Sequence, residues 1–305
     1  MKTKRLALAL LTVALLVGCA GPVRSPGLPL AVESVPMRPI PKTLGVMFSF
    51  EGDNLQTKTG VVASVVVFET WERVAPGPGQ FNPDALNRVV DRYKDQTVTL
   101  LDGSVVPVPI VTQIIPYLSG APDQPAGVDF SDRTPQWLYE RGVPHVDLGG
   151  KLVGYALECP SGRVAELPRY DSAEWWAAWH DTVRQFAQWA ESQPQVVGIV
   201  AAVGLDGETQ PVKNWGSCAY ATYLAQIPGL ERAWALGVEQ TIKVYGEAFG
   251  PTGITWWLNN APGGMGRPVR AQLALDAGGS LKHSDGVPDL DWAHSKPGTS
   301  IEGGG

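Results

Sequence analysis

The segment from Val196 to Glu208 constrains the fold of this chain more than any other. It is an apolar run rich in β-branched residues, and it ends in Gly204-Leu205-Asp206-Gly207-Glu208. A continuous apolar run predicts a strand buried on both faces, as in a parallel sheet covered by helices. Barrel enzymes keep their catalytic side chains at the carboxyl ends of such strands, so Glu208 is a candidate acid. Alternatively, Asp206 and Glu208 cap the next helix or are solvated in a loop.

The N-terminus predicts an exported protein. Met1-Lys2-Thr3-Lys4-Arg5 is basic, and the apolar run from Leu6 to Val17 is too short to span a bilayer. It ends in Leu16-Val17-Gly18-Cys19, which resembles the bacterial lipobox, where cleavage before the cysteine is followed by lipid attachment to its thiol. We therefore expect residues 1–18 to be a lipoprotein signal peptide and Cys19 to anchor the protein in the bacterial cell envelope. An ordinary secretory signal is the alternative, and it also places the mature protein outside the cytoplasm.

The rest of the chain divides into a tether and one large domain. Residues 19–42 are rich in proline and lack hydrophobic periodicity, which predicts an extended segment. Residues 43–305 are enough for a single α/β barrel domain. The net charge of −6 gives no support for nucleic-acid binding, which requires a basic face. No cofactor or metal site is expected, because the four histidines are scattered.

Apolar strands alternate with amphipathic helices, a pattern that predicts a mostly parallel sheet. Six strands are expected, at residues 44–50, 61–68, 105–117, 196–208, 254–258 and 280–283. Helices are expected at residues 83–93, 171–191, 230–249 and 269–276, and residues 118–170 form a long excursion rich in proline and glycine. A closed barrel of eight strands needs more chain than this. We therefore expect a (β/α)8 TIM-type barrel that is incomplete here, with about six to seven strands, because the sequence is truncated.

Two segments carry a resemblance to a known family. The first is Phe68-Glu69-Thr70-Trp71-Glu72-Arg73-Val74-Ala75-Pro76-Gly77-Pro78-Gly79-Gln80-Phe81-Asn82. The second is Pro168-Arg169-Tyr170-Asp171, followed by a tryptophan-rich helix and the strand that ends at Glu208. In order and spacing they resemble the β-galactosidase-like glycoside hydrolases, a barrel superfamily with its acid/base after strand four and its nucleophile after strand seven. The resemblance implies hydrolysis of an oligo- or polysaccharide.

Carried over to this chain, the resemblance implies that Glu208 is the general acid/base. Glycosidic oxygen is a poor leaving group, so a protonated carboxyl group must donate to it. A second carboxylate, about 5–5.5 Å away in retaining enzymes, attacks the sugar. Glu302 is the late candidate for this nucleophile, although the strand that should carry it has no clear counterpart. Gly207 is a further departure, because the family usually has an Asn there that contacts the sugar 2-hydroxyl.

Polar and aromatic residues at the ends of the predicted strands are candidates for sugar binding. Carbohydrate sites combine aromatic faces, which contact the apolar C–H surface of a sugar, with polar groups that bind its hydroxyls. These candidates are Glu69, Trp71, Gln113, Tyr117, Asp206, Trp256, Asn259, Asn260 and His283. The tryptophans at 175, 176 and 179 follow helical spacing and are expected in the core instead.

Two cysteines remain once Cys19 carries lipid. Cys159 and Cys218 are expected to form a disulfide, because the predicted compartment is oxidising. Two further functions stay open beside the enzyme. One is a lipid-anchored carbohydrate-binding protein that kept the barrel and lost the chemistry, as Gly207 and the missing nucleophile favour. The other is a structural lipoprotein without a ligand, whose strand-end polar groups would pair with one another.

Overall fold

The computed structural model describes most of the predicted domain. The described residues are 64–99, 103, 105–119, 130–147, 151–153, 156–158, 166–201, 203–204, 207–209, 228–260 and 267–282. They all belong to one compact unit, Arg38–Gly305. Several predictions fall outside them: the signal peptide, the tether, the strand at 44–50, Cys19, Cys159, Asp206, Cys218, His283 and Glu302. Within the described part, no helix has the length and apolar character to cross a bilayer.

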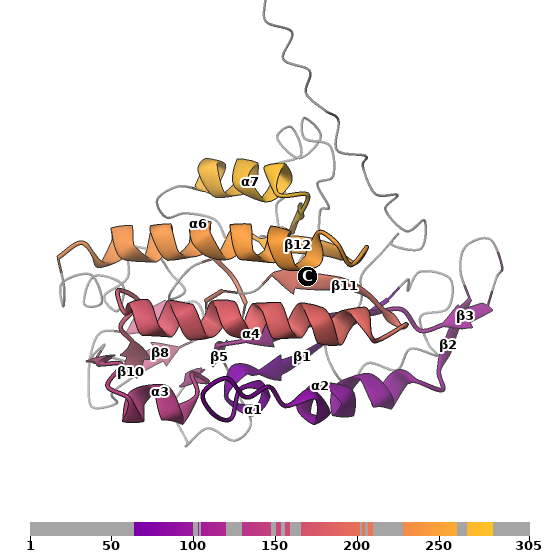
Figure 1. The fold of residues 1–305 in the computed structure, drawn as a ribbon, viewed down its shortest axis with the longest axis horizontal. Coiled ribbons are helices and arrows are strands. Elements are labelled where there is room, and N and C mark those ends of the chain that lie inside the picture. The colour runs from indigo at the N-terminus through magenta and orange to yellow at the C-terminus, as the bar shows by residue number, and fades with distance from the viewer. Residues whose placement is uncertain are drawn as a thin grey trace, which may run out of the picture. The chain divides into compact units, whose positions relative to one another are not determined.

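A five-stranded parallel sheet organises this unit (Figure 1). Its strands are β1 (Val65–Thr70), β4 (Ile110–Ile115), β11 (Val196–Ala201), β12 (Thr255–Asn259) and β13 (Ser280–Lys282), side by side in that order. Strand order therefore follows chain order, unlike a doubly wound sheet, in which the order reverses. Because parallel crossovers are right-handed, sequential order places every connecting helix on the same face.

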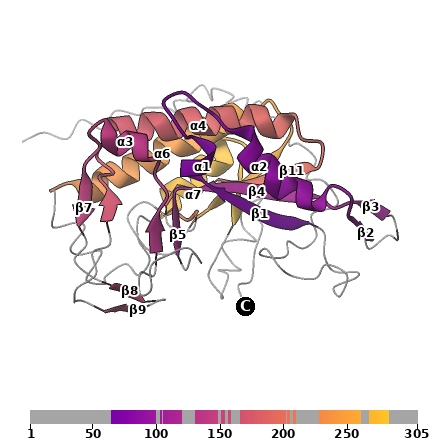
Figure 2. The ribbon, with the colours of Figure 1, turned by 90° about the horizontal axis from the view of Figure 1, so that it is seen from below.

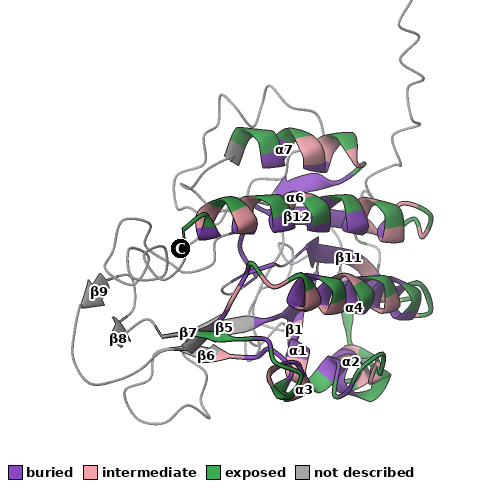
Figure 3. Ribbon diagram, turned by 60° about the vertical axis from the view of Figure 1, so that its left-hand side comes forward, coloured by how far each residue is buried: buried purple, intermediate pink, exposed green. Residues whose placement is uncertain are grey.

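Four helices connect neighbouring strands and cover that face. They are α2 (Pro83–Val90), α4 (Ala173–Glu191), α6 (Leu230–Phe249) and α7 (Arg267–Asp276). Figure 2 shows α4 and α6 together on one side of β1 and β4. In Figure 3 each long helix carries buried residues along one side and exposed residues along the other. The sheet thus has a helix-covered face and an opposite face.

Each face of the sheet has its own apolar cluster. The larger cluster lies between the sheet and the helices, where Trp71, Trp175 and Trp179 have no exposed surface. Trp71 meets the other two rings edge-on, with centroids 5.2 and 5.0 Å apart. The smaller cluster, on the opposite face, consists of Val66, Val111, Val200 and Trp257. Alternation of side chains along each strand explains why neighbours such as Trp256 and Trp257 belong to different clusters.

The bounds of the two long helices, α4 and α6, agree closely with the bounds predicted from the sequence. Helix α6 has the predicted bounds, and α4 begins two residues later than predicted, where the Ser172 hydroxyl oxygen accepts a bond from the Trp175 N–H. The strand expected at 105–117 is instead three shorter ones: β3 (Val105–Pro107), β4 and β5 (Tyr117–Ser119). Proline lacks the N–H that a ladder needs, and Pro107, Pro109 and Pro116 divide the run.

The excursion between β4 and α4 contains short elements of its own. They are β5, β6 (Phe130–Asp132), α3 (Gln136–Glu140), β7 (His145–Asp147), β8 (Lys151–Val153), β9 (Ala156–Glu158) and β10 (Glu166–Pro168). The strands form antiparallel pairs, β5 with β6, β7 with β10, and β8 with β9. A further pair, β2 (Thr97–Thr99) with β3, precedes β4. Three-residue strands are too short to show a hydrophobic period in sequence.

The structure thus confirms an α/β fold with a mostly parallel sheet. Sequential strand order and helices on a single face are compatible with a TIM-type barrel. The five strands do not by themselves define a closed sheet, so the eight-stranded arrangement stays a prediction.

Candidate functional site

The carboxyl ends of the five strands meet at one edge of the sheet, and polar side chains gather there. By alternation, Gln113 shares a strand face with Val111, and Asn259 shares one with Trp257. Val111 and Trp257 belong to the cluster on the face opposite the helices. Gln113 and Asn259 therefore lie on that same face, at the edge where barrel enzymes carry their active sites.

Gln113 has an unsatisfied polar atom at this edge. The residue is only 5% exposed, and among the described residues its Oε1 has no hydrogen-bond donor. Leaving a buried acceptor without a donor costs about 1–3 kcal/mol. Its side chain is therefore poised to accept a bond from a group outside the described part of the chain. A ligand hydroxyl is one such group.

Glu208 lies seven residues beyond the end of β11, because the strand stops at Ala201 and does not continue to Glu208 as expected. The Gly204 N–H donates to the Glu208 carbonyl at 2.8 Å, and the Gly207 N–H donates to the Gly204 carbonyl at 3.1 Å. Gly207 has φ +78°, a left-handed conformation that glycine adopts without steric cost. Glu208 is 9% exposed, which excludes the alternative of a fully solvated side chain.

Thr209, the residue after Glu208, is held at three points. Its N–H donates to the Asn259 carbonyl at 3.0 Å, and its own carbonyl accepts a bond from Trp234 Nε1 at 3.0 Å. Its hydroxyl donates to Asn260 Oδ1 at 3.4 Å. These bonds join the Glu208 loop to the end of β12 and to α6, so the backbone at Glu208 has little freedom to move.

A buried arginine completes this group. Arg270 lies on α7, and its Nε donates to Asn260 Oδ1 at 3.3 Å. The Asn260 oxygen thus accepts bonds from two protein donors, Arg270 and Thr209. Asn260 was a candidate for sugar binding, whereas Arg270 was not among the candidate residues. In the structure, the oxygen of Asn260 is used within the protein.

Glu69 does not face the candidate site, contrary to expectation. It lies on the helix-covered side of β1, where its Oε2 accepts a bond from Arg88 at 2.6 Å. Its Oε1 accepts bonds from the Thr70 N–H at 2.9 Å and from Arg73 at 3.4 Å. Both oxygens therefore hold α1 (Trp71–Val74) and α2 against the strand. This geometry corrects the assignment of Glu69 to substrate binding.

Trp71 and Trp256 also lie on the helix side of the sheet. The Trp71 indole N–H donates to the Thr182 hydroxyl on α4 at 2.9 Å. Trp256 is buried and stacks on Tyr245 of α6, with ring centroids 6.0 Å apart. Neither ring offers a face to a sugar in this structure, and we correct their assignment as stacking platforms. Tyr117 begins β5, immediately beyond Pro116 at the carboxyl end of β4.

A further carboxyl group, which sequence reasoning missed, lies near the ends of β1 and β4. The Arg133 N–H donates to the Pro116 carbonyl at 2.9 Å, and the Arg133 carbonyl accepts from the Glu72 N–H at 2.8 Å. These bonds bring the preceding residue, Asp132, to the carboxyl edge of the sheet. The signal that could have found it is Asp132-Arg133-Thr134-Pro135, a turn sequence directly before α3.

The surroundings of Asp132 favour its protonated form. Its Oδ2 accepts a bond from the Tyr139 hydroxyl, and its Oδ1 accepts one from the Thr134 N–H at 2.8 Å. The residue as a whole is half-buried, but its carboxyl group is enclosed by protein. This loss of solvation raises the pKa of Asp132 from 3.8 to about 7, although the two hydrogen bonds and nearby His145 act in the opposite direction.

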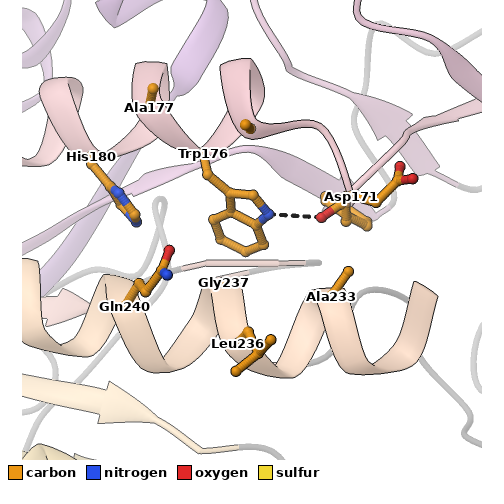
Figure 4. A pocket seen from close by; sticks show the side chains of 10 residues that line it. Asp171, Trp176, Ala177, His180, Ala233, Leu236, Gly237 and Gln240 are labelled. Carbon is orange, nitrogen blue, oxygen red and sulfur yellow. Dashed lines mark hydrogen bonds between the residues drawn. The ribbon is translucent and has the colours of Figure 1, made fainter. Parts of the chain in front are cut away.

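A groove of about 390 Å³ lies between the N-terminal halves of α4 and α6 (Figure 4). The ring of Trp176 lies at its centre, and the indole N–H donates to the Tyr170 carbonyl at 2.7 Å. His180 lines the groove and contacts the Thr241 hydroxyl at 2.9 Å through Nε2. Burial and the positive charge of Arg184 lower the pKa of His180 to about 4, so its ring is neutral at pH 7. This groove lies in the helix layer, not on the Gln113 face.

Within the described residues, no group of three or more His, Cys, Asp or Glu side chains is arranged to hold a metal ion. Comparison of the chain with protein-family models and with curated proteins gives no match.

Proposed function

We propose that this protein is an extracytoplasmic, lipid-anchored glycoside hydrolase that acts on an oligo- or polysaccharide. Its fold in this proposal is a TIM-type barrel, as the resemblance of residues 44–290 to the β-galactosidase-like superfamily implies. The observation that carries the proposal is the position of Glu208: a buried residue, with its backbone held by hydrogen bonds, in the loop that follows a strand of a parallel sheet.

In the proposed reaction, Glu208 donates its proton to the glycosidic oxygen as the bond to the sugar breaks. Gln113 and Asn259, on the same edge and face of the sheet, bind sugar hydroxyls. The buried Oε1 of Gln113 supports this role, because it has an acceptor position that no described residue fills. Catalysis of this kind depends on holding the acid in place, and the clamped backbone at Thr209 supplies that rigidity.

A lipid-anchored carbohydrate-binding protein is the second candidate, and one observation favours it. Glu69 is the only carboxylate within the five sheet strands, and both its oxygens are bound on the helix side. It is therefore not available as the second carboxylate of the reaction. Glu302, the candidate nucleophile, lies outside the described residues. The structural lipoprotein is less well supported, since it requires strand-end groups to pair with one another, and no described residue donates to Gln113 Oε1.

The test is hydrolysis by the full-length protein and its Glu208→Gln variant. A panel of aryl glycosides and of natural oligosaccharides would identify a substrate, and affinity electrophoresis would measure binding. We expect the variant to lose about 10²–10⁴-fold in kcat on poor leaving groups while its sugar affinity stays nearly unchanged. Gln188→Ala, at an exposed position on α4, is the control.

Three outcomes separate the candidates. Hydrolysis that depends on Glu208 supports the enzyme. Sugar binding by the wild type without any hydrolysis supports the binding protein and contradicts the enzyme. Equal hydrolysis by the wild type and the Glu208→Gln variant contradicts the assignment of Glu208, even if the protein is a hydrolase.

A further inference from the structure

A chain of hydrogen bonds connects the buried Arg270 to Thr209, the residue next to Glu208. Arg270 is 1% exposed, on the helix that connects β12 to β13. Its Nε reaches Asn260 Oδ1, and the same oxygen accepts the Thr209 hydroxyl. Thr209 is the residue next to Glu208. Two hydrogen bonds thus connect α7 to the loop that carries the candidate acid.

An arginine in this position is costly. Its guanidinium keeps its charge at any working pH, and a buried charge is unfavourable unless polar groups surround it. The neighbouring buried positions on the same helix, Ala271 and Ala274, are apolar. In some proteins a buried polar contact of this kind holds a group in one geometry, and this is the role considered for Arg270.

Asn260 links Arg270 to Thr209, because its Oδ1 accepts a hydrogen bond from each of them. Arg270 lies on α7 and Thr209 lies in the loop after β11. The side-chain amide of Asn260 therefore connects α7 to that loop. Two further bonds of Thr209, to the Asn259 carbonyl and from Trp234 Nε1, hold its backbone. The bond to Asn260 engages the Thr209 side chain, and so connects it to Arg270.

We propose that Arg270 is a positioning residue for Glu208, acting through Asn260 and Thr209. This inference rests on the proposed function, because it assumes that Glu208 donates a proton. It assigns no contact between Arg270 and substrate. Its role is to hold the loop so that the carboxyl group of Glu208 meets the leaving-group oxygen, and small displacements of such groups reduce rates strongly.

Leaving-group dependence distinguishes positioning of the acid from general damage to the site. A dinitrophenyl glycoside needs no proton to release its leaving group, whereas an alkyl or natural glycoside does. We expect Arg270→Met to lower kcat by about tenfold to a hundredfold on the poor leaving group and by less than about threefold on the dinitrophenyl substrate, with KM unchanged. Arg270→Lys keeps the charge and one donor, and it should recover part of the loss.

Thr209→Val tests the same chain from its other end. It removes the hydroxyl, preserves shape and leaves Arg270 in place, so it guards against a failure of Arg270→Met to fold. We expect the same selective loss on poor leaving groups. Gln272→Ala is the control, because Gln272 lies on the same helix with an exposed side chain, which donates to Asp276 Oδ1 at 2.8 Å.

Each result decides one question. An equal loss on both substrates in folded Arg270→Met and Thr209→Val, or a loss no larger than that of Gln272→Ala, overturns the positioning role while the proposed function stands. A wild-type protein that hydrolyses neither substrate overturns the proposed function and this inference together.

Discussion

The ring of Trp176 lies directly on Gly237, so that a Cβ atom at position 237 would be 2.1 Å from the indole carbons. This contact joins α4 to α6 with no space for a side chain. Glycine in a helix interior is ordinarily unfavourable, by roughly 0.5–1 kcal/mol relative to alanine. Its presence here follows from the packing of the tryptophan between the two helices.

Gly237→Ala should therefore destabilise the protein, although the same change usually stabilises a helix. The added methyl group forces Trp176 out of its position, and overpacking of this kind costs about 1–3 kcal/mol. Urea unfolding followed by tryptophan fluorescence measures the difference. Leu236→Ala, at the exposed neighbouring position, is the matched control and should change the free energy of unfolding little.

Asp132 should make the protein less stable as pH rises. Its folded-state pKa of about 7 lies above the ordinary value of 3.8, so the folded protein retains a proton that the unfolded chain releases. The stability that this proton provides is complete below about pH 4 and is lost as the pH rises through about 7. Asp132→Asn should remove that loss. Urea unfolding at a series of pH values tests it, and an unchanged pH profile in the variant would exclude the raised pKa.

His180 should act in the opposite direction over much of the same range. Its pKa is lowered from 6.5 to about 4, so the unfolded chain binds a proton that the folded protein does not. Its contribution is complete above about pH 6.5 and is lost as the pH falls toward about 4. His180→Gln, which keeps a donor for Thr241, should reduce the loss of stability on acidification. NMR titration of the His180 ring would check the assignment directly, and a midpoint near 6.5 would refute it.

Cys19→Ala should release the protein from membranes. The prediction follows from Leu16-Val17-Gly18-Cys19 after a basic segment, and a lipid on the cysteine is the expected anchor. Fractionation of cells into membrane and soluble parts measures it, with Cys159→Ala as a control that should remain membrane-bound. Retention of Cys19→Ala in the membrane fraction would mean that another segment anchors the chain.

Sequence periodicity was sufficient to predict the bounds of the long helices. It was not sufficient to predict which face of the sheet each strand residue lies on. Helix α6 was predicted with its observed bounds because Pro228-Gly229 and Gly250-Pro251 flank a regular apolar pattern. The strand β1 was predicted to end at Phe68, but it continues to Thr70. That difference of two residues places Glu69 inside the strand, where alternation directs it to the helices.

The residues of the candidate site could also be predicted only in part from the sequence. Position after an apolar run was enough to find Glu208, Gln113 and Asn259. Nothing local distinguishes Trp256 from Trp257, because which of two adjacent residues faces the helices depends on pairing with other strands. Arg270 was missed for a related reason: its role depends on a bond to Asn260 in another element.

The four strand pairings of the sheet differ in the loss of chain entropy that accompanies their formation. A single helix separates β12 from β13, so their pairing closes a short loop. The pair β4 and β11 is different, since the whole excursion and α4 lie between them. Loop-closure entropy grows with the length of chain between partners. The pairing of β4 with β11 therefore has the largest loop-closure cost of the four strand pairings.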